Sequence, residues 1–130
     1  AVLAMSVAHA GSREQFGRPI ARFQAVRHAL ATMAADVTAA VTAVTAAALR
    51  PGPIEVMTAK IETSRAATAV ARLAHQVHGA IGTTWEHPLH RYTSRLWSWR
   101  DEYGSETYWA KRLADHVHAA GDDLWRALAG

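Results

Sequence analysis

Residues able to bind a phosphate group occur first in the stretch Ser12–Gln24. Arg13 lies there shortly before Phe16 and Gly17, and its guanidinium is a planar fork of donors that matches phosphate oxygens. Glycine supplies the backbone freedom that a helix exit needs, so Gly17 predicts a tight turn between two helices. Taken alone, Arg13 has a simpler interpretation, which is an exposed arginine at a helix end.

A second stretch, Gln76–Pro88, combines a carboxamide with glycines. Gln76 precedes Gly79 and Gly82, and glycine lets a backbone approach a ligand without a side chain in the way. The simpler interpretation is that Gly79 ends a helix. Both interpretations predict a helix end at this point, followed by a loop.

Histidine offers a different chemistry, because imidazole is a common metal ligand. The chain has eight histidines, and three pairs are close in sequence: His75 with His78, His87 with His90, and His116 with His118. None stands in the H-E-x-x-H frame of a helical zinc site, and no cysteine is present to add a ligand. The sequence therefore predicts no metal site, and we interpret each histidine as a surface or interface residue.

The composition predicts the elements that position these residues. Half of the residues are hydrophobic, and alanine, the best helix former, dominates them. The eight glycines and four prolines cluster at a few positions, as helix punctuation does. We predict an all-α fold, an up-and-down antiparallel four-helix bundle, with helical segments over 1–14, 21–49, 53–78, 89–102 and 106–120.

Apolar spacing predicts the buried faces of the two long helices. In the helix over 21–49 the apolar stripe consists of Phe23, Leu30, Met33, Val37, Val41, Val44 and Ala48. In the helix over 53–78 the inner face consists of Ile54, Met57, Ile61, Ala67, Val70, Ala71, Ala74 and Val77. Small residues on this second face would let a neighbouring helix approach closely.

The net charge of +3 is mild, and the basic residues are dispersed along the chain. No dense basic run would follow a nucleic-acid backbone, and no uninterrupted apolar stretch reaches the ~20 residues of a membrane span. We therefore expect no nucleic-acid and no membrane partner. The lack of cysteine fits a cytoplasmic location. Residues 1–10 resemble the tail of a helix, so we expect a fragment or a chain whose front part has been removed.

Together the two stretches resemble the acyl-CoA dehydrogenases, a family of FAD enzymes. Arg13–Gln24 is similar to the family's R-x-x-F-G-x-P-I-x-x-F-Q stretch. Gln76–Gly82 is similar to its Q-x-x-G-G-x-G stretch, with Ala80 in place of the second glycine. The resemblance implies one domain over 1–130, the C-terminal helical domain of the family, without the N-terminal helical domain and the middle β-domain. We therefore expect the isolated chain to be inactive.

The resemblance also implies a cofactor. In the family, the arginine reaches the pyrophosphate of an FAD held mainly by a neighbouring subunit, and the glutamine and nearby backbone meet its adenosine part. The residues that would bind FAD in this chain are Arg13, Gln15, Phe16, Gln76, Gly79, Ala80, Ser105 and Thr107.

The catalytic base of the family is the main departure. In many members a glutamate before Gly-Thr-x-Gln takes the α-proton of the acyl-CoA, and here that position falls on Tyr103, followed by Gly104. Tyrosine is a poor base, since its reference pKa is ~10. Glu102 is the candidate catalytic residue, although one residue turns a helix by about 100°. Some members place the base on an earlier helix, and others assemble from two different chains of which one has lost it.

The implied function is α,β-dehydrogenation of an acyl-CoA thioester in fatty acid or steroid catabolism, with electrons leaving through an electron-transfer flavoprotein. The implied assembly is a homo- or hetero-oligomer. The alternative is a non-catalytic subunit or domain that completes the FAD site of a partner chain, and Tyr103 favours that alternative.

Overall fold

The computed structural model describes residues 1–119 and 121. The helices of this part of the chain are α1 (Val2–Ser12), α2 (Gln24–Leu49), α3 (Pro53–His78), α4 (Leu89–Asp101) and α5 (Glu106–Ala119). Between them lie two short strands, β1 (Glu14–Gln15) and β2 (Arg18–Pro19), and two 3-10 turns, η1 (Ile20–Arg22) and η2 (Gly79–Thr83). The predicted all-α fold is confirmed.

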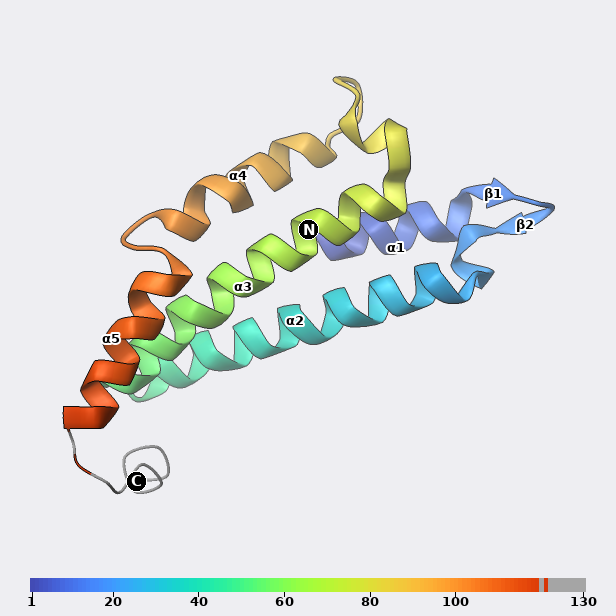
Figure 1. The fold of residues 1–130 in the computed structure, drawn as a ribbon. Helices are drawn as coiled ribbons and strands as arrows, with labels where there is room; N and C mark the ends of the chain where they lie inside the picture. The colour runs from blue at the N-terminus through green and yellow to red at the C-terminus, as the bar shows by residue number, and fades with distance from the viewer. Residues whose placement is uncertain (120, 122–130) are drawn as a thin grey trace.

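The helices form a bundle around α3, which contacts each of the other four. Figure 1 shows that α1, α2, α3 and α4 run alternately in opposite directions, as short connections between long helices favour. The fifth helix, α5, packs against the beginning of α3 instead of extending α4. As a result α1 ends beside the end of α3, and the turn between α4 and α5 lies toward the other end.

Small side chains explain why α3 lies at the centre. Ala66, Ala67, Ala71 and Ala74 are all buried, so neighbouring helices can approach its backbone closely. The main apolar cluster consists of Val2, Met33, Val70, Leu73, Ala74 and Leu89, contributed by four helices. Most of the face predicted for this helix is buried, and only Ile54 and Ile61 are half-buried.

The face predicted for α2 is wrong in its second half. Met33 is fully buried, but Val41 is 59% exposed and Val44 is 47% exposed. Ala48 is exposed as well. The periodic pattern identifies the apolar side of a helix, but the other helices of this chain cover only its first half.

By length and composition alone, α2 is the one helix of residues 1–119 and 121 that could cross a membrane. A mostly buried core helix passes the same test, but only 11% of the apolar window of α2 is buried, although α2 lies lengthwise against α3. The expectation of no membrane partner stays a prediction.

The connection between α1 and α2 differs from the predicted simple turn. Helix α1 ends at Ser12, and β1 pairs with β2 in an antiparallel hairpin whose loop is Phe16–Gly17. Both loop residues have positive φ, 52° and 74°, which is the pattern of the hairpin turns that match strand twist. The hairpin and the boundary before it replace the last two residues expected for the first helix, and η1 delays the start of α2 to Gln24.

Candidate functional site

Arg13 is held by its backbone at the boundary between α1 and the hairpin. Its amide donates to the carbonyl of His9 at 2.8 Å, and its carbonyl accepts from the amide of Ile20 at 2.8 Å. The side chain is exposed, and in the described residues 1–119 and 121 it forms none of the ion pairs. The backbone is therefore fixed while the guanidinium faces solvent.

The hairpin presents the next two predicted residues beyond Arg13. Gln15 is exposed on β1, and the Phe16 ring is 90% exposed at the tip. The ring of Phe16 contacts Phe23 edge-on, with centroids 6.0 Å apart, and the Arg18 guanidinium lies 4.4 Å from the centre of the Phe23 ring. These contacts orient an aromatic ring that the rest of the bundle leaves uncovered.

The second predicted group lies at the end of α3. Gln76 is exposed on its last turn, and Gly79 follows with φ +62°. A Cβ placed on Gly79 would meet nothing within 4 Å, so the backbone there is open to a ligand. Ala80 is exposed in η2. This helix end is the one that the sequence predicted.

The structure brings these two groups to the same end of the bundle. His9 lies one turn before Arg13, and its ring stacks on that of His78 with centroids 4.4 Å apart and an angle of 22°. His78 is two residues beyond Gln76. The guanidinium and the carboxamide therefore come from adjacent helix ends, as Figure 1 shows for α1 and α3.

Glu102 and Tyr103 lie in a separate turn, after α4. Helix α4 ends at Asp101, Glu102 is extended with φ −62° and ψ 137°, and Tyr103 has φ +59°. Both side chains are exposed. The 100° helical offset expected between them therefore does not apply, because neither residue is helical.

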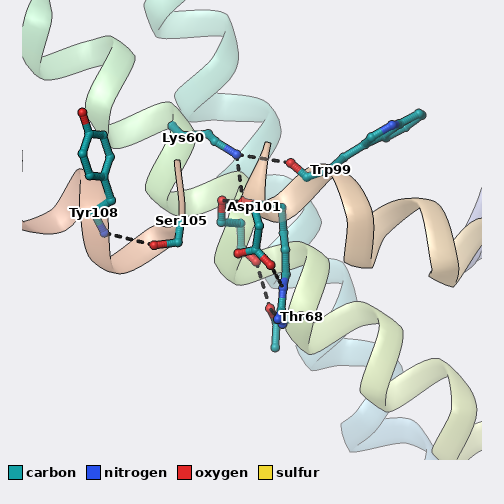
Figure 2. A network of polar contacts seen from close by, with 8 residues as sticks. Lys60, Thr68, Trp99, Asp101, Ser105 and Tyr108 are labelled. Atoms are coloured by element: carbon teal, nitrogen blue, oxygen red, sulfur yellow. Dashed lines mark hydrogen bonds and ion pairs between the residues drawn. The ribbon is translucent and has the colours of Figure 1, made fainter. Parts of the chain in front are cut away.

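A polar network fixes this turn against α3 (Figure 2). Lys60 donates to the carbonyls of Trp99 and Arg100 at 3.3 and 2.8 Å, and the buried Ser64 hydroxyl donates to the Arg100 carbonyl at 2.9 Å. These bonds satisfy carbonyls that the end of a helix leaves without partners. The indole of Trp109 also donates to the Tyr103 carbonyl at 2.9 Å.

The last two predicted residues lie at the start of α5. Ser105 caps this helix, accepting from the amide of Tyr108 at 3.3 Å. Ser105 and Thr107 line a pocket of about 190 Å³ together with Ser64, Thr68, Arg100, Asp101 and Glu106. Twelve residues of α3 separate Ser64 from Gln76, about 18 Å at ~1.5 Å per residue. The nine predicted residues thus form two groups and not one.

The sequence interpretation missed a group of three histidines. His9, His78 and His87 each offer a ring nitrogen, and these nitrogens lie within 4.8 Å of one another. The pairs considered along the sequence could not reveal this group, because it takes one histidine from each of three elements. The signal available was weak: His78 and His87 lie within the second stretch, and His9 lies three residues before the first.

Burial lowers the pKa of two of these histidines, His9 and His78. Burial lowers the pKa of His9 below its ordinary value, and the nearby His78, His87 and Arg13 charges lower it further. Burial also lowers the pKa of His78, against the opposing effect of a hydrogen bond to the Ala74 carbonyl. Both rings are therefore mainly neutral at pH 7.

The fold defines an all-α helical-bundle domain. The family model of the acyl-CoA dehydrogenase C-terminal domain matches residues 1–117. This chain belongs to the acyl-CoA dehydrogenase family.

Similar proteins agree with this assignment. Acyl-CoA dehydrogenase IpdE2 of Mycobacterium tuberculosis is 41% identical over 93 residues, which make up 72% of this chain and 29% of that protein. Acyl-CoA dehydrogenase FadE34 of the same organism is 41% identical over 116 residues, covering 83% of this chain and 16% of that protein. The chain thus spans less than a third of each of these relatives.

Solved structures agree as well. The ChsE4-ChsE5 complex from Mycobacterium tuberculosis has a chain with a TM-score of 0.78 and 34% identity, covering 90% of this chain and 33% of that one. Butyryl-CoA dehydrogenase from Megasphaera elsdenii has a TM-score of 0.84 and 26% identity, covering 89% of this chain and 32% of that one.

Proposed function

We propose that this chain completes the FAD site of an acyl-CoA dehydrogenase-like assembly and contributes to its oligomerisation. The reaction is α,β-dehydrogenation of an acyl-CoA thioester, with an electron-transfer flavoprotein as electron acceptor, in the cytoplasm. One observation carries the proposal: the exposed Arg13 and Gln76 side chains come from adjacent helix ends, joined by the stacked His9 and His78 rings.

The residues at this end fit a dinucleotide. The Arg13 guanidinium offers charged donors to a pyrophosphate, and such bonds are about twice as strong as neutral ones. The open backbone at Gly79 and the exposed carboxamide of Gln76 suit the polar edge of an adenosine. When bound, FAD supplies the hydride acceptor of the dehydrogenation; the residues named here bind and orient it.

An exposed aromatic tip supports a role within an assembly. Phe16 is 90% exposed on the hairpin beside Arg13, and large exposed apolar groups mark interaction sites. The uncovered half of α2, with Val41 and Val44 exposed, is a second such surface. We propose that another subunit covers these residues in a homo- or hetero-oligomer.

The second candidate function is a non-catalytic assembly subunit. The observation that favours it is Tyr103, which occupies the position of the family's glutamate base. The ChsE4-ChsE5 structure is by its name a complex of two proteins, and one of its chains resembles this one at a TM-score of 0.78. Under this candidate function, Arg13 and Gln76 complete a partner's FAD site while the partner supplies the base.

The first experiment measures FAD binding by the visible absorption of the flavin. We expect the isolated chain to be colourless and to become yellow when combined with the domains or chain that hold the rest of FAD. Arg13→Ala should weaken FAD binding about 10- to 100-fold, since a hydrogen bond to a charged group is worth about 1.5–3 kcal/mol. Arg27→Ala, an equal charge change at an exposed position of α2, is the matched control. Equal FAD affinity in Arg13→Ala and Arg27→Ala would contradict the proposal.

The second experiment separates the two candidate functions. In the assembled protein, Glu102→Gln should lower the dehydrogenation rate about 10²- to 10⁴-fold if Glu102 is the general base. An unchanged rate supports the assembly subunit. Glu106→Gln, also exposed and four residues further on, is the matched control, and an equal loss in both variants would assign the effect to surface charge.

A further inference from the structure

Three histidines from separate elements meet around His78. His9 lies on the last turn of α1, His78 is the last residue of α3, and His87 lies in the segment before α4. The His78 ring centre is 4.4 Å from that of His9 and 4.9 Å from that of His87. His78 is the most buried of the three, at 5% exposure, and the other two are half-buried beside it.

Hydrogen bonding determines which nitrogen of His78 is available. Its Nδ1 lies 2.8 Å from the carbonyl of Ala74, which can only accept, so Nδ1 carries the proton. In the neutral ring Nε2 then holds a lone pair. This Nε2 is buried and has no hydrogen-bond partner within residues 1–119 and 121. A buried acceptor without a partner is uncommon in native proteins and calls for a ligand or another explanation.

We propose that His9, His78 and His87 bind one transition-metal dication of the zinc class, with Nε2 of His78 as the central ligand. Imidazole nitrogen suits this class of metal ion. Three protein ligands leave a fourth position of a tetrahedral site open to water. The proposal does not depend on the proposed flavin function, because none of its ligands is a residue assigned to FAD.

The hydrogen bond that His78 donates to the Ala74 carbonyl supports this role. A ligand histidine in proteins usually donates its other ring N–H to a carbonyl or carboxylate, which fixes the tautomer and the ring orientation. The carbonyl of Ala74 accepts this bond from Nδ1 of His78.

The geometry requires a modest rearrangement. Zinc–nitrogen bonds of ~2.0–2.1 Å place tetrahedral ligand nitrogens about 3.3 Å apart. The nitrogens now lie within 4.8 Å, so rotation of the half-buried His9 and His87 rings has to bring them closer. Nδ1 of His87 also accepts a 3.2 Å hydrogen bond from the Leu89 amide. To bind the metal through Nε2, His87 has to adopt the tautomer with the proton on Nδ1, and it then loses this hydrogen bond.

The surroundings both help and oppose a cation. The ring of His90 stacks on Trp85 at 5.3 Å and its Nδ1 donates to the His87 carbonyl at 2.7 Å, which holds the segment that carries His87. The Arg13 charge repels a cation near His9. Because Arg13 is exposed, solvent and salt screen this repulsion.

Zinc titration of the purified protein, prepared without a histidine tag and stripped with EDTA, tests the proposal. We expect one equivalent of Zn²⁺ to bind and the melting temperature to rise. Co²⁺ in place of Zn²⁺ should give the visible bands of a tetrahedral site. His9→Gln and His87→Gln should each weaken Zn²⁺ binding at least ~10- to 100-fold, the loss found even for outer-shell groups.

One control variant and one independent measurement make the test decisive. His28→Gln, at an exposed position of α2, removes a histidine outside the group and should leave Zn²⁺ affinity unchanged. Equal Zn²⁺ affinity in the unmodified protein, His9→Gln and His87→Gln would overturn the proposal. If a variant fails to fold, the ¹⁵N resonance of His78 Nε2 in the unmodified protein gives the answer: it moves on Zn²⁺ addition if the site exists, and an unmoved resonance rejects the site.

Discussion

Two turns of this chain share one backbone conformation. Phe16–Gly17 and Tyr103–Gly104 each consist of an aromatic residue with φ of 52° or 59° followed by a glycine with positive φ. The aromatic rings are 90% and 91% exposed. Positive φ costs a non-glycine residue roughly 1–2 kcal/mol. Each turn therefore has an aromatic residue at a position where glycine would cause less backbone strain.

The two turns differ in what surrounds them. The first has Arg13 and Gln15 beside it and matches the family motif. The second has Tyr103 where the family resemblance would place the base, and Lys60 and Ser64 nearby donate to the Arg100 carbonyl. The two turns therefore share a backbone conformation and differ in the side chains that surround them.

The largest expected difference concerns charge. Phe16→Glu places a carboxylate three residues from Arg13 on the hairpin and should weaken FAD binding in the assembled protein about tenfold or more, because the carboxylate repels the FAD pyrophosphate. Tyr103→Glu places the same charge at the second turn and should change FAD affinity less. Flavin absorption measures both, and equal losses would show that the turns do not differ in their relation to FAD.

The glycines should differ in the free energy of unfolding. A Cβ on Gly104 would lie 2.6 Å from the Tyr108 ring and 2.8 Å from the Trp109 indole, whereas a Cβ on Gly17 meets nothing within 4 Å. We expect Gly104→Ala to cost about 2–5 kcal/mol, from positive φ and overpacking. Gly17→Ala should cost about 1–2 kcal/mol, from φ alone. Urea unfolding measures both, and the reverse order would show that the second turn is the looser one.

The hydrogen bond from Ser64 to the second turn should contribute about 1 kcal/mol to the free energy of unfolding. Ser64→Ala removes the buried hydroxyl that donates to the Arg100 carbonyl, and a typical hydrogen bond contributes about 0.5–1.5 kcal/mol. Thr38→Ala is the matched control, because Thr38 is exposed and donates only to a carbonyl of its own helix. If urea unfolding finds equal losses in the two variants, the network in Figure 2 does not hold the turn.

Replacing the aromatic residues should have a smaller effect. Tyr103→Gly should stabilise the protein by up to about 1 kcal/mol, because glycine adopts positive φ without strain and little buried area is lost. Phe16→Gly should be near neutral, since it also loses the edge-on contact with Phe23, and aromatic pairs are worth about 0.5–1.5 kcal/mol. Thermal unfolding compares them, and a loss of stability in Tyr103→Gly would reveal an unrecognised contact of that ring.

The end of the bundle that carries the first turn should also be sensitive to acid. In EDTA, the unfolded chain binds protons at histidine as pH falls below the ordinary pKa of 6.5, while His9 and His78 in the folded chain resist protonation. The free energy of unfolding should therefore be highest above pH 6.5 and decrease as pH falls toward the lowered folded-state pKa values. His78→Gln should flatten this decrease and His28→Gln should not. If the free energy of unfolding decreases equally with falling pH in the two variants, the burial of His78 is not the cause of the acid sensitivity.

Local signals accounted for most of the helices. Pro53 and Gly79 bracket α3 where the sequence predicted, and Ser105 caps α5 as expected. The hairpin was missed, because a two-residue strand has too few residues to show alternation. The outer half of the α2 stripe was wrong, because apolar periodicity reports which side of a helix is apolar and not whether another element covers it.

The site was predictable only as separate motifs. Arg13 and Gln76 were identified from their neighbours in sequence, and the structure places them at adjacent helix ends, while their role in binding FAD stays a prediction. That Glu102 and Tyr103 are extended and left-handed instead of helical was not predictable, since Lys60 and Ser64 of another helix hold that helix end.

By itself, the sequence determined the helices, most of their ends and the family, because propensity, glycine and proline positions and short motifs are local properties. Only the tertiary structure decided which motifs share an end of the bundle and that His9, His78 and His87 form a group. Contacts of this kind depend on how helix ends stack, and residues 69 positions apart, such as His9 and His78, have no local signal that links them.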